Sequence, residues 1–167
     1  MVDRPAPDEE LNTGEEIEPR QAATAIVLRD GEHGLEVLLV QRNPEASFMG
    51  GAWVFPGGAL SEDDDGHAAA ALRELEEEAG VRIEDVGRLV PYSRWIRPAD
   101  ALRAGASDEL MLVFPTIKHL EQLAELDSVE DALRAARARE VVAIQPRVVV
   151  ADDGARVLLP GEPGYDE

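Results

Sequence analysis

The sequence contains no cysteine, which excludes disulfide bonds, thiolate metal ligands and thiol catalysis. It is also poor in basic residues: 16 lysines and arginines stand against 35 aspartates and glutamates, so the formal net charge is −19. Such an excess of negative charge repels nucleic-acid backbones and anionic membrane surfaces. We therefore expect neither nucleic acid nor a membrane as a partner.

Long hydrophobic runs are missing as well. No apolar stretch is long enough to span a bilayer, and the first twenty residues lack the basic start and apolar segment of a secretory signal peptide. The absence of cysteine fits a reducing compartment. We therefore expect an unexported, cytoplasmic protein.

The chain length indicates a single domain. Its 167 residues, 44% of them hydrophobic, suffice for one core but not for two comfortable ones. Residues 1–20 combine proline, glycine and acids with few large apolar groups, so we expect a disordered acidic arm there. The domain should cover residues 21–160, with a helical extension toward its C-terminal end, and residues 161–167 should form a tail.

Short apolar and β-branched runs separated by turn residues predict several strands. The first two should form a hairpin around the turn sequence GEHG, and the last two should form a terminal hairpin. The expected strands cover residues 22–30, 35–42, 52–55, 86–96 and the two arms of a hairpin between 141 and 160. Gly57 and Gly58 should lie in the turn or loop that follows the third of these.

Helical periodicity predicts four helices after the first strands. They are expected at residues 67–79, 97–105, 115–126 and 128–138. Pro98 suits a position in the first turn of a helix, and the spacing of Ser128 and Asp131 is typical of an N-terminal cap. Mixed strands and helices of this kind indicate an α/β fold.

The first predicted helix is dense in glutamate, although like charges three and four residues apart destabilise a helix. At 100° per residue, one side of it should form a core stripe about 100° wide, with Leu72 at one edge. The other members of that stripe are Ala68, Ala71, Leu75 and Ala79. On the same wheel Glu74, Glu77 and Glu78 converge, whereas Glu76 points elsewhere.

The i, i+3, i+4 spacing of Glu74, Glu77 and Glu78 brings together hard oxygen ligands of the kind that Mg²⁺ prefers. A bound cation would turn their mutual repulsion into attraction. An acidic helix face can equally be a solvated surface. An EF-hand loop is excluded because it would need an acid at position 61 and a glutamate at position 72, where the chain has Ser61 and Leu72.

The stretch Arg73–Val81 resembles the helical half of the Nudix box, REUxEExGU with U apolar, at every fixed position. The sequence FPGG at residues 55–58 precedes it, as in many Nudix hydrolases. This resemblance implies an αβα sandwich with a mixed central sheet, together with the C-terminal helices and the short hairpin. With the flanking similarities described below, it covers most of the chain after Ala22.

The resemblance also implies roles for individual residues. Glu74, Glu77 and Glu78 would bind Mg²⁺ or Mn²⁺, and Arg73 would orient these glutamates through a salt bridge. The metal coordination would be completed by the carbonyl of Gly58. Both Gly57 and Gly58 would let the backbone approach a ligand closely.

Two further positions are left open by the resemblance. The family pattern begins Gly-x5-Glu-x7-Arg, and counting back from Arg73 puts Asp65 at the glutamate position and Ala59 at the glycine position. The loop is thus one residue longer than the pattern, and either Asp65 or Glu62 would replace the glutamate. Arg42 is a candidate for binding a substrate phosphate, although a surface arginine is an equal alternative.

The implied reaction is divalent-metal-dependent hydrolysis of the diphosphate bond in a nucleoside diphosphate linked to another group. Residues 38–58 are similar to the approach to the box in coenzyme A diphosphatases, and the C-terminal part is similar to a bacterial group related to the peroxisomal coenzyme A diphosphatases. Coenzyme A or an acyl derivative is therefore the first substrate to consider. The general base stays open between Glu77 and an acid of the Glu62–Asp65 loop.

The chain departs from these relatives after the box. Its sequence LVPYS runs directly into RWIRPADAL, where relatives carry further strands. We therefore expect a sheet that lacks at least one strand and part of the substrate wall. The exposed edge would favour a homodimer through strand pairing. The alternative function is a Nudix-like module that binds a nucleotide or a protein partner without turnover.

Overall fold

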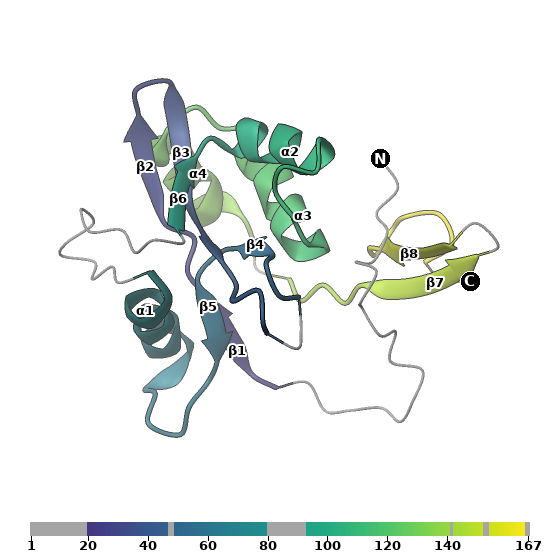
Figure 1. Cartoon of the computed structure of the whole chain (residues 1–167), viewed down its shortest axis with the longest axis horizontal. Helices are drawn as coiled ribbons and strands as arrows, with labels where there is room; N and C mark the ends of the chain where they lie inside the picture. Colours follow the sequence, from purple (N-terminus) through teal and green to yellow (C-terminus); the bar gives the residue numbers. More distant parts are fainter. Residues whose placement is uncertain (1–19, 47–48, 80–92, 141, 152–153, 166–167) are drawn as a thin grey trace.

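The computed structural model describes residues 20–46, 49–79, 93–140, 142–151 and 154–165 (Figure 1). Its strands are β1 (Ala22–Thr24), β2 (Leu28–Gly31), β3 (Gly34–Gln41), β4 (Trp53–Val54), β5 (Gly57–Ala59), β6 (Ser93–Ile96), β7 (Arg147–Ala151) and β8 (Gly154–Leu158). Its helices are α1 (Gly66–Ala79), α2 (Pro98–Ala106), α3 (Phe114–Leu123) and α4 (Val129–Ala138). In this part of the chain, no helix is long and apolar enough to cross a membrane.

Strand β3 is the centre of the main sheet. It forms the predicted antiparallel hairpin with β2, and Gly34 supplies the positive φ of 116° at the turn. The C-terminal end of β3 pairs with β4, while its residues 37–40 pair with β6. Because β6 overlaps the stretches paired with both β2 and β4, these two strands share one edge of β3 and β6 occupies the other.

The extended run from β1 to β2 joins two ladders. Strand β1 pairs with β5 in the register Ala23 to Gly58, whereas β2 pairs with β3. Between them, the Ala25 N–H donates to the Pro56 carbonyl at 2.8 Å. The expectation of a turn or loop at Gly57 and Gly58 is therefore wrong: both glycines belong to a short strand, because β1 offers them a backbone ladder.

Alternate residues of β3 face two separate parts of the core. Val37 and Leu39 pack with Ala101 of α2 and Leu120 of α3. Their neighbours Leu38 and Val40 pack instead with residues of α1. A strand with both faces buried reads as a continuous apolar run, as VLLV at residues 37–40 does here.

The resulting architecture is an αβα sandwich. Figure 1 shows α1 on one side of the strands and α2 with α3 on the other. The described ladders are antiparallel, and one parallel bridge joins Trp53 to Leu112. The predicted fold class, an α/β sandwich with four helices and mixed sheets, is confirmed.

Local signals at the helix starts are confirmed too. Pro98 lies in the first turn of α2. Ser128 caps α4: its hydroxyl oxygen accepts from the Asp131 N–H at 3.2 Å, and it lies 2.7 Å from the Asp131 carboxylate. A long-range contact completes this cap, because the Asp30 carboxylate of β2 accepts the Val129 N–H at 2.8 Å.

The predicted core stripe of α1 is rotated in the structure. Ala70, Leu75 and Ala79 are buried, but Leu72, a predicted member of the stripe, is 46% exposed. The reason is that α1 packs against the β1–β5 ladder through the helix face that carries Glu74. The apolar positions alone did not indicate that polar side chains would share the buried face.

The terminal hairpin is also confirmed, with a later start. Strand β7 begins at Arg147, not at residue 141, and Pro146 lacks the N–H that a continuous ladder would need. The proposed arm before residue 20, the tail at residues 166–167 and most of the strand expected at 86–96 lie outside the described residues. The domain limits and the missing strand therefore stay predictions.

The rotation of α1 can be tested by comparing two leucines. Leu38→Ala removes a fully buried side chain between the sheet and α1 and should lower the free energy of unfolding by about 2–5 kcal/mol. Leu72→Ala should cost less than about 1 kcal/mol, because that side chain is half in solvent. Urea denaturation of both variants measures the difference, and equal losses would contradict this placement of the core.

Candidate active site

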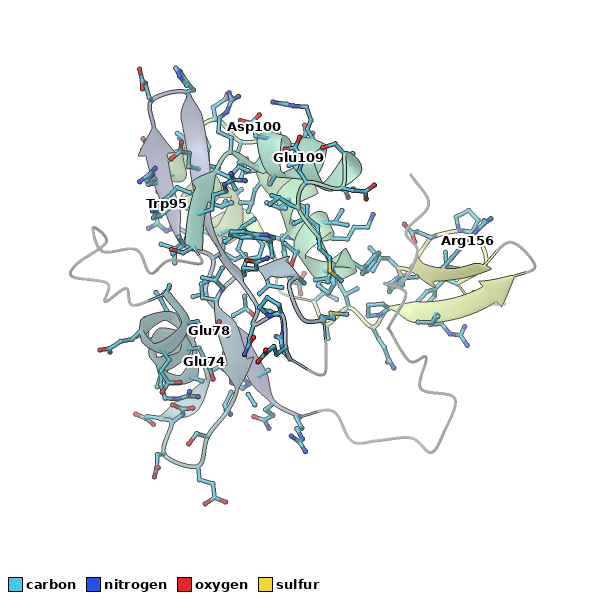
Figure 2. The ribbon with its side chains drawn as sticks, in the orientation of Figure 1. Glu74, Glu78, Trp95, Asp100, Glu109 and Arg156 are labelled. Carbon is cyan, nitrogen blue, oxygen red and sulfur yellow. The ribbon has the colours of Figure 1, made fainter. Side chains whose placement is uncertain are left out.

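The glutamate face of α1 meets the two glycines of β5. The N–H of Gly57 donates to Glu78 Oε2 at 3.0 Å. At Gly58 a side chain has no room, since a β-carbon at this position would overlap the Glu74 carboxylate. Figure 2 shows Glu74 and Glu78 together on the side of α1 nearest β5. Gly57 and Gly58 thus let two carboxylates pack against backbone.

Arg73 connects the helix to the loop before it. Its guanidinium lies 2.9 Å from Glu74 Oε1 and 3.1 Å from Glu77 Oε2, and it donates to the Ala59 carbonyl at 3.1 Å. A paired contact with Asp64, at 3.1 and 2.9 Å, completes the set. The Arg73 guanidinium therefore pairs with three carboxylates and fixes the loop against α1.

The loop partner of Arg73 is Asp64, which the sequence reasoning missed. Asp65 and Glu62, the expected candidates, are exposed, whereas the Asp64 side chain is 6% exposed. Asp64 also accepts the Ser61 N–H at 2.8 Å, which closes the loop. Counting forward from Gly58 would have found it, because Gly58-x5-Asp64 keeps the family spacing. The extra residue lies between Asp64 and Arg73.

The charges of the site are coupled. Arg73 lowers the pKa of Asp64, with help from the Ser61 N–H, and the carboxylates of Asp64 and Glu74 raise the pKa of Arg73 further above its ordinary value. Burial raises the pKa of Glu78, and the negative charges of Glu74 and Glu77 act in the same direction. These glutamates therefore share one electrostatic neighbourhood.

Arg42 belongs to the same neighbourhood. It follows β3, and its backbone is held by the Ala52 carbonyl at 2.9 Å and by the Gly51 N–H at 3.2 Å. Its positive charge and the Gly57 N–H both act to lower the pKa of Glu78, against the effect of burial. The fold thus brings the predicted phosphate-binding arginine to the predicted carboxylates.

The donor set can be compared with the needs of a divalent cation. Among the described residues, no three His, Asp or Glu side chains are arranged to hold a metal. Instead, Glu74 and Glu77 bind Arg73 and Glu78 binds Gly57. The chemistry nonetheless fits, since three carboxylates within five residues are hard oxygen donors that a cation would stabilise. The pKa of one of them, Glu78, is raised by burial and by the charges of the other two. Binding would require the carboxylates to exchange partners.

A family comparison covers the part of the chain that carries these residues. The model of the NUDIX domain matches residues 19–159. The chain belongs to the Nudix family. Its Arg73 to Ala79 segment is the described part of the stretch that resembles the Nudix box, and α1 carries this segment with Arg73 bound to the loop before it.

Similar proteins agree with the family assignment. Over 114 residues the chain is 35% identical to the Nudix hydrolase NudL of Escherichia coli K12, covering 60% of this chain and 58% of NudL. It is 42% identical over 82 residues to NudL of Citrobacter koseri, covering 47% of this chain and 42% of that protein. The chain thus spans about half the length of these relatives.

A solved structure shows the shared fold. The crystal structure of a NUDIX hydrolase from Alicyclobacillus acidocaldarius superposes with a TM-score of 0.59 at 22% identity. The match covers 70% of this chain and 96% of that protein. At this identity the likeness concerns the arrangement of strands and helices only.

Gly58→Ala should disturb the site without unfolding the protein. The added methyl group would clash with the Glu74 carboxylate and displace it, so Mn²⁺ affinity should fall about tenfold or more. Isothermal titration measures the affinity, with circular dichroism to confirm folding. Ala59→Ser, at the exposed neighbouring position, is the matched control and should bind as the unmodified protein does. Equal affinity in Gly58→Ala would contradict the role of close packing.

Asp64→Asn should destabilise the protein in a pH-dependent way. Because the folded pKa of Asp64 lies below its unfolded value of about 3.9, its ion pair stabilises the fold above that pH and is lost as the pH falls through the folded pKa. The stability difference between the unmodified protein and the variant should thus be full at neutral pH and shrink below about pH 4. Denaturant titrations at several pH values measure it.

Asp65→Asn is the control for this experiment, since it removes the neighbouring exposed carboxylate and leaves Arg73 paired. It should leave stability nearly unchanged at every pH. A larger effect at position 65 than at position 64 would mean that Asp65, and not Asp64, is the loop acid that pairs with Arg73.

Proposed function

We propose that this protein is a divalent-metal-dependent hydrolase that cleaves the diphosphate bond of a nucleoside diphosphate linked to another group. The supporting observation is the cluster formed by Glu74, Glu77 and Glu78 with Arg73, set against the glycine backbone of β5. Family membership supports the reaction class, since the box that carries these residues is the shared feature.

Glu74, Glu77 and Glu78 are the residues that would hold Mg²⁺ or Mn²⁺, and the Gly58 carbonyl is the candidate for a further ligand. When bound, such a cation lowers the pKa of water and neutralises charge on phosphoryl oxygens. The chain itself must place the carboxylates, and this is the task of Arg73 and Asp64. Their contacts hold the loop and the helix in one arrangement.

Arg42 is the proposed contact to the substrate phosphate. Its charge acts on Glu78, so a phosphate bound beside the carboxylates would lie within its field. In a protein of net charge −19, an anionic substrate needs such local positive charge. Gly57 and Gly58 add a backbone surface without side chains, which a phosphate can approach closely.

Coenzyme A or an acyl derivative is the first substrate that we propose. The sequence on both sides of the box is similar to coenzyme A diphosphatases, and Arg42 follows β3 at the position expected from that similarity. Of the proposed general bases, Glu77 has a side chain that is 61% exposed, which leaves it accessible to water.

Turnover assays test the proposal. Phosphate-bond hydrolysis should be measured with Mg²⁺ and with Mn²⁺ on coenzyme A, ADP-ribose, NADH, dinucleoside polyphosphates and nucleoside triphosphates. Glu78→Gln should reduce the rate at least about 10- to 100-fold, because it removes one donor of the cluster. Glu76→Gln alters an exposed residue of the same helix and should keep most of the activity.

The outcomes separate the two functions considered. Hydrolysis of one substrate that Glu78→Gln abolishes would establish the enzyme and its substrate class. A folded protein that binds Mn²⁺ but hydrolyses none of these compounds would instead be a Nudix-like binding module. If Glu76→Gln and Glu78→Gln lost activity equally, the assignment of the metal-binding face would be wrong.

A further inference from the structure

The C-terminal arm, residues Val142 to Leu158, exposes an unusual amount of apolar surface. Eight large hydrophobic side chains are exposed in the described part of the chain, and four of them lie in this arm. They are Val142, Ile144, Val148 and Val149, with 38–67% exposure. Figure 1 shows the β7–β8 hairpin apart from the sandwich, on the side opposite α1. Such concentrated apolar exposure indicates a contact surface.

The hairpin in this arm also has an open edge. Among the described strands, β7 pairs with β8 alone, so its other edge carries no ladder. Tyr165 contacts the arm where β7 begins. Its hydroxyl donates to the Gln145 carbonyl at 2.7 Å, and its ring lies under the Arg147 guanidinium. The middle of β7 is left uncovered by these contacts. An isolated two-stranded hairpin is marginally stable in water and gains from a further strand.

Charge favours a second copy of this chain as the additional strand. Two copies, each with a net charge of −19, repel one another overall. Residues 141–151 contain no acid, so this stretch does not add to the repulsion. In an antiparallel pairing of β7 with itself, centred on Val149, Arg147 stands opposite position 151 and Val148 opposite position 150. No like charges therefore face each other across the two-fold axis.

The other edge of the hairpin does not have this property. The equivalent antiparallel pairing of β8 with itself is centred on Arg156, which would place two arginines directly opposite one another. Like charges at directly opposed positions destabilise a ladder. The self-complementary edge is thus β7.

We infer that two copies of this protein associate through β7, forming a four-stranded sheet β8-β7-β7-β8 across a two-fold axis. In this arrangement Val149 of one copy packs beside Val149 of the other, Val148 lies beside position 150, and the open edge of β7 is removed. Because α1 lies on the opposite side of the molecule from the arm, the glutamate site of each copy stays accessible (Figure 1).

Cysteine cross-linking tests the register directly, because the chain has no cysteine of its own. In the proposed dimer, Val149→Cys places two cysteines directly opposite, about 4.5–5.5 Å apart at Cβ, within reach of a disulfide bond. Val148→Cys is the matched control: the two cysteines would be diagonal neighbours about 7–8 Å apart. Leu133→Cys, exposed on α4, measures accidental collisions.

Under mild oxidation, Val149→Cys should give a disulfide-linked dimer as the main species, and the two controls should give far less. Light scattering after size exclusion should show a dimer for the unmodified protein and a monomer for Val149→Lys, with Leu133→Lys still dimeric. A monomeric unmodified protein would overturn the inference. So would a dimer that Val149→Lys leaves intact and that does not cross-link through position 149. Neither readout depends on hydrolase activity.

Discussion

The site depends on how ionised carboxylates are accommodated on the packed side of a helix. Burying a carboxylate costs several kcal/mol unless a cation or hydrogen-bond donor compensates it. Here Arg73 pairs with Asp64, Glu74 and Glu77, and the Gly57 N–H donates to Glu78. Without these partners, α1 could not turn its glutamates toward β5, and the loop before it would have no anchor.

The sheet supplies the rigid support for this arrangement. Strand β3 is buried on both faces, so α1 on one side and α2 with α3 on the other are fixed relative to the same eight residues. Strand β1 then extends the support to β5, which delivers the two glycines to the helix. The side chains of the site are thus positioned by backbone ladders, which vary little in geometry, and by one branched ion-pair network.

The raised pKa of Glu78 has a structural meaning as well. Its burial and the neighbouring negative charges oppose ionisation, whereas Arg42 and the Gly57 N–H favour it. A cluster with such internal repulsion is a poor way to stabilise a fold but a good way to attract a cation. The free energy that the repulsion costs becomes part of the binding free energy when a cation is taken up.

Much of this was readable from the sequence. The continuous apolar run of β3, Pro98 at the start of α2 and the Ser128–Asp131 cap depend on residues close together in the chain, and the Nudix box depends on fixed spacing. The choice of loop acid was ambiguous, because counting back from Arg73 selects Asp65 whereas counting forward from Gly58 selects Asp64. Since these neighbouring acids have the same chemistry, only the path of the loop decides between the two registers. The strand at Gly57 and Gly58 was missed for a similar reason, since its pairing partner β1 lies more than thirty residues away.

The sequence by itself determined the family, the α/β class and the set of carboxylates on α1, because periodicity and motif spacing are local properties. Tertiary structure decided which face of α1 is buried, with Leu72 in solvent and Glu74 against Gly58. It also decided which acid pairs with Arg73 and that Arg42 comes near Glu78. These features depend on contacts between distant segments, and their free energies are set by burial and charge proximity, which exist only once the chain has folded.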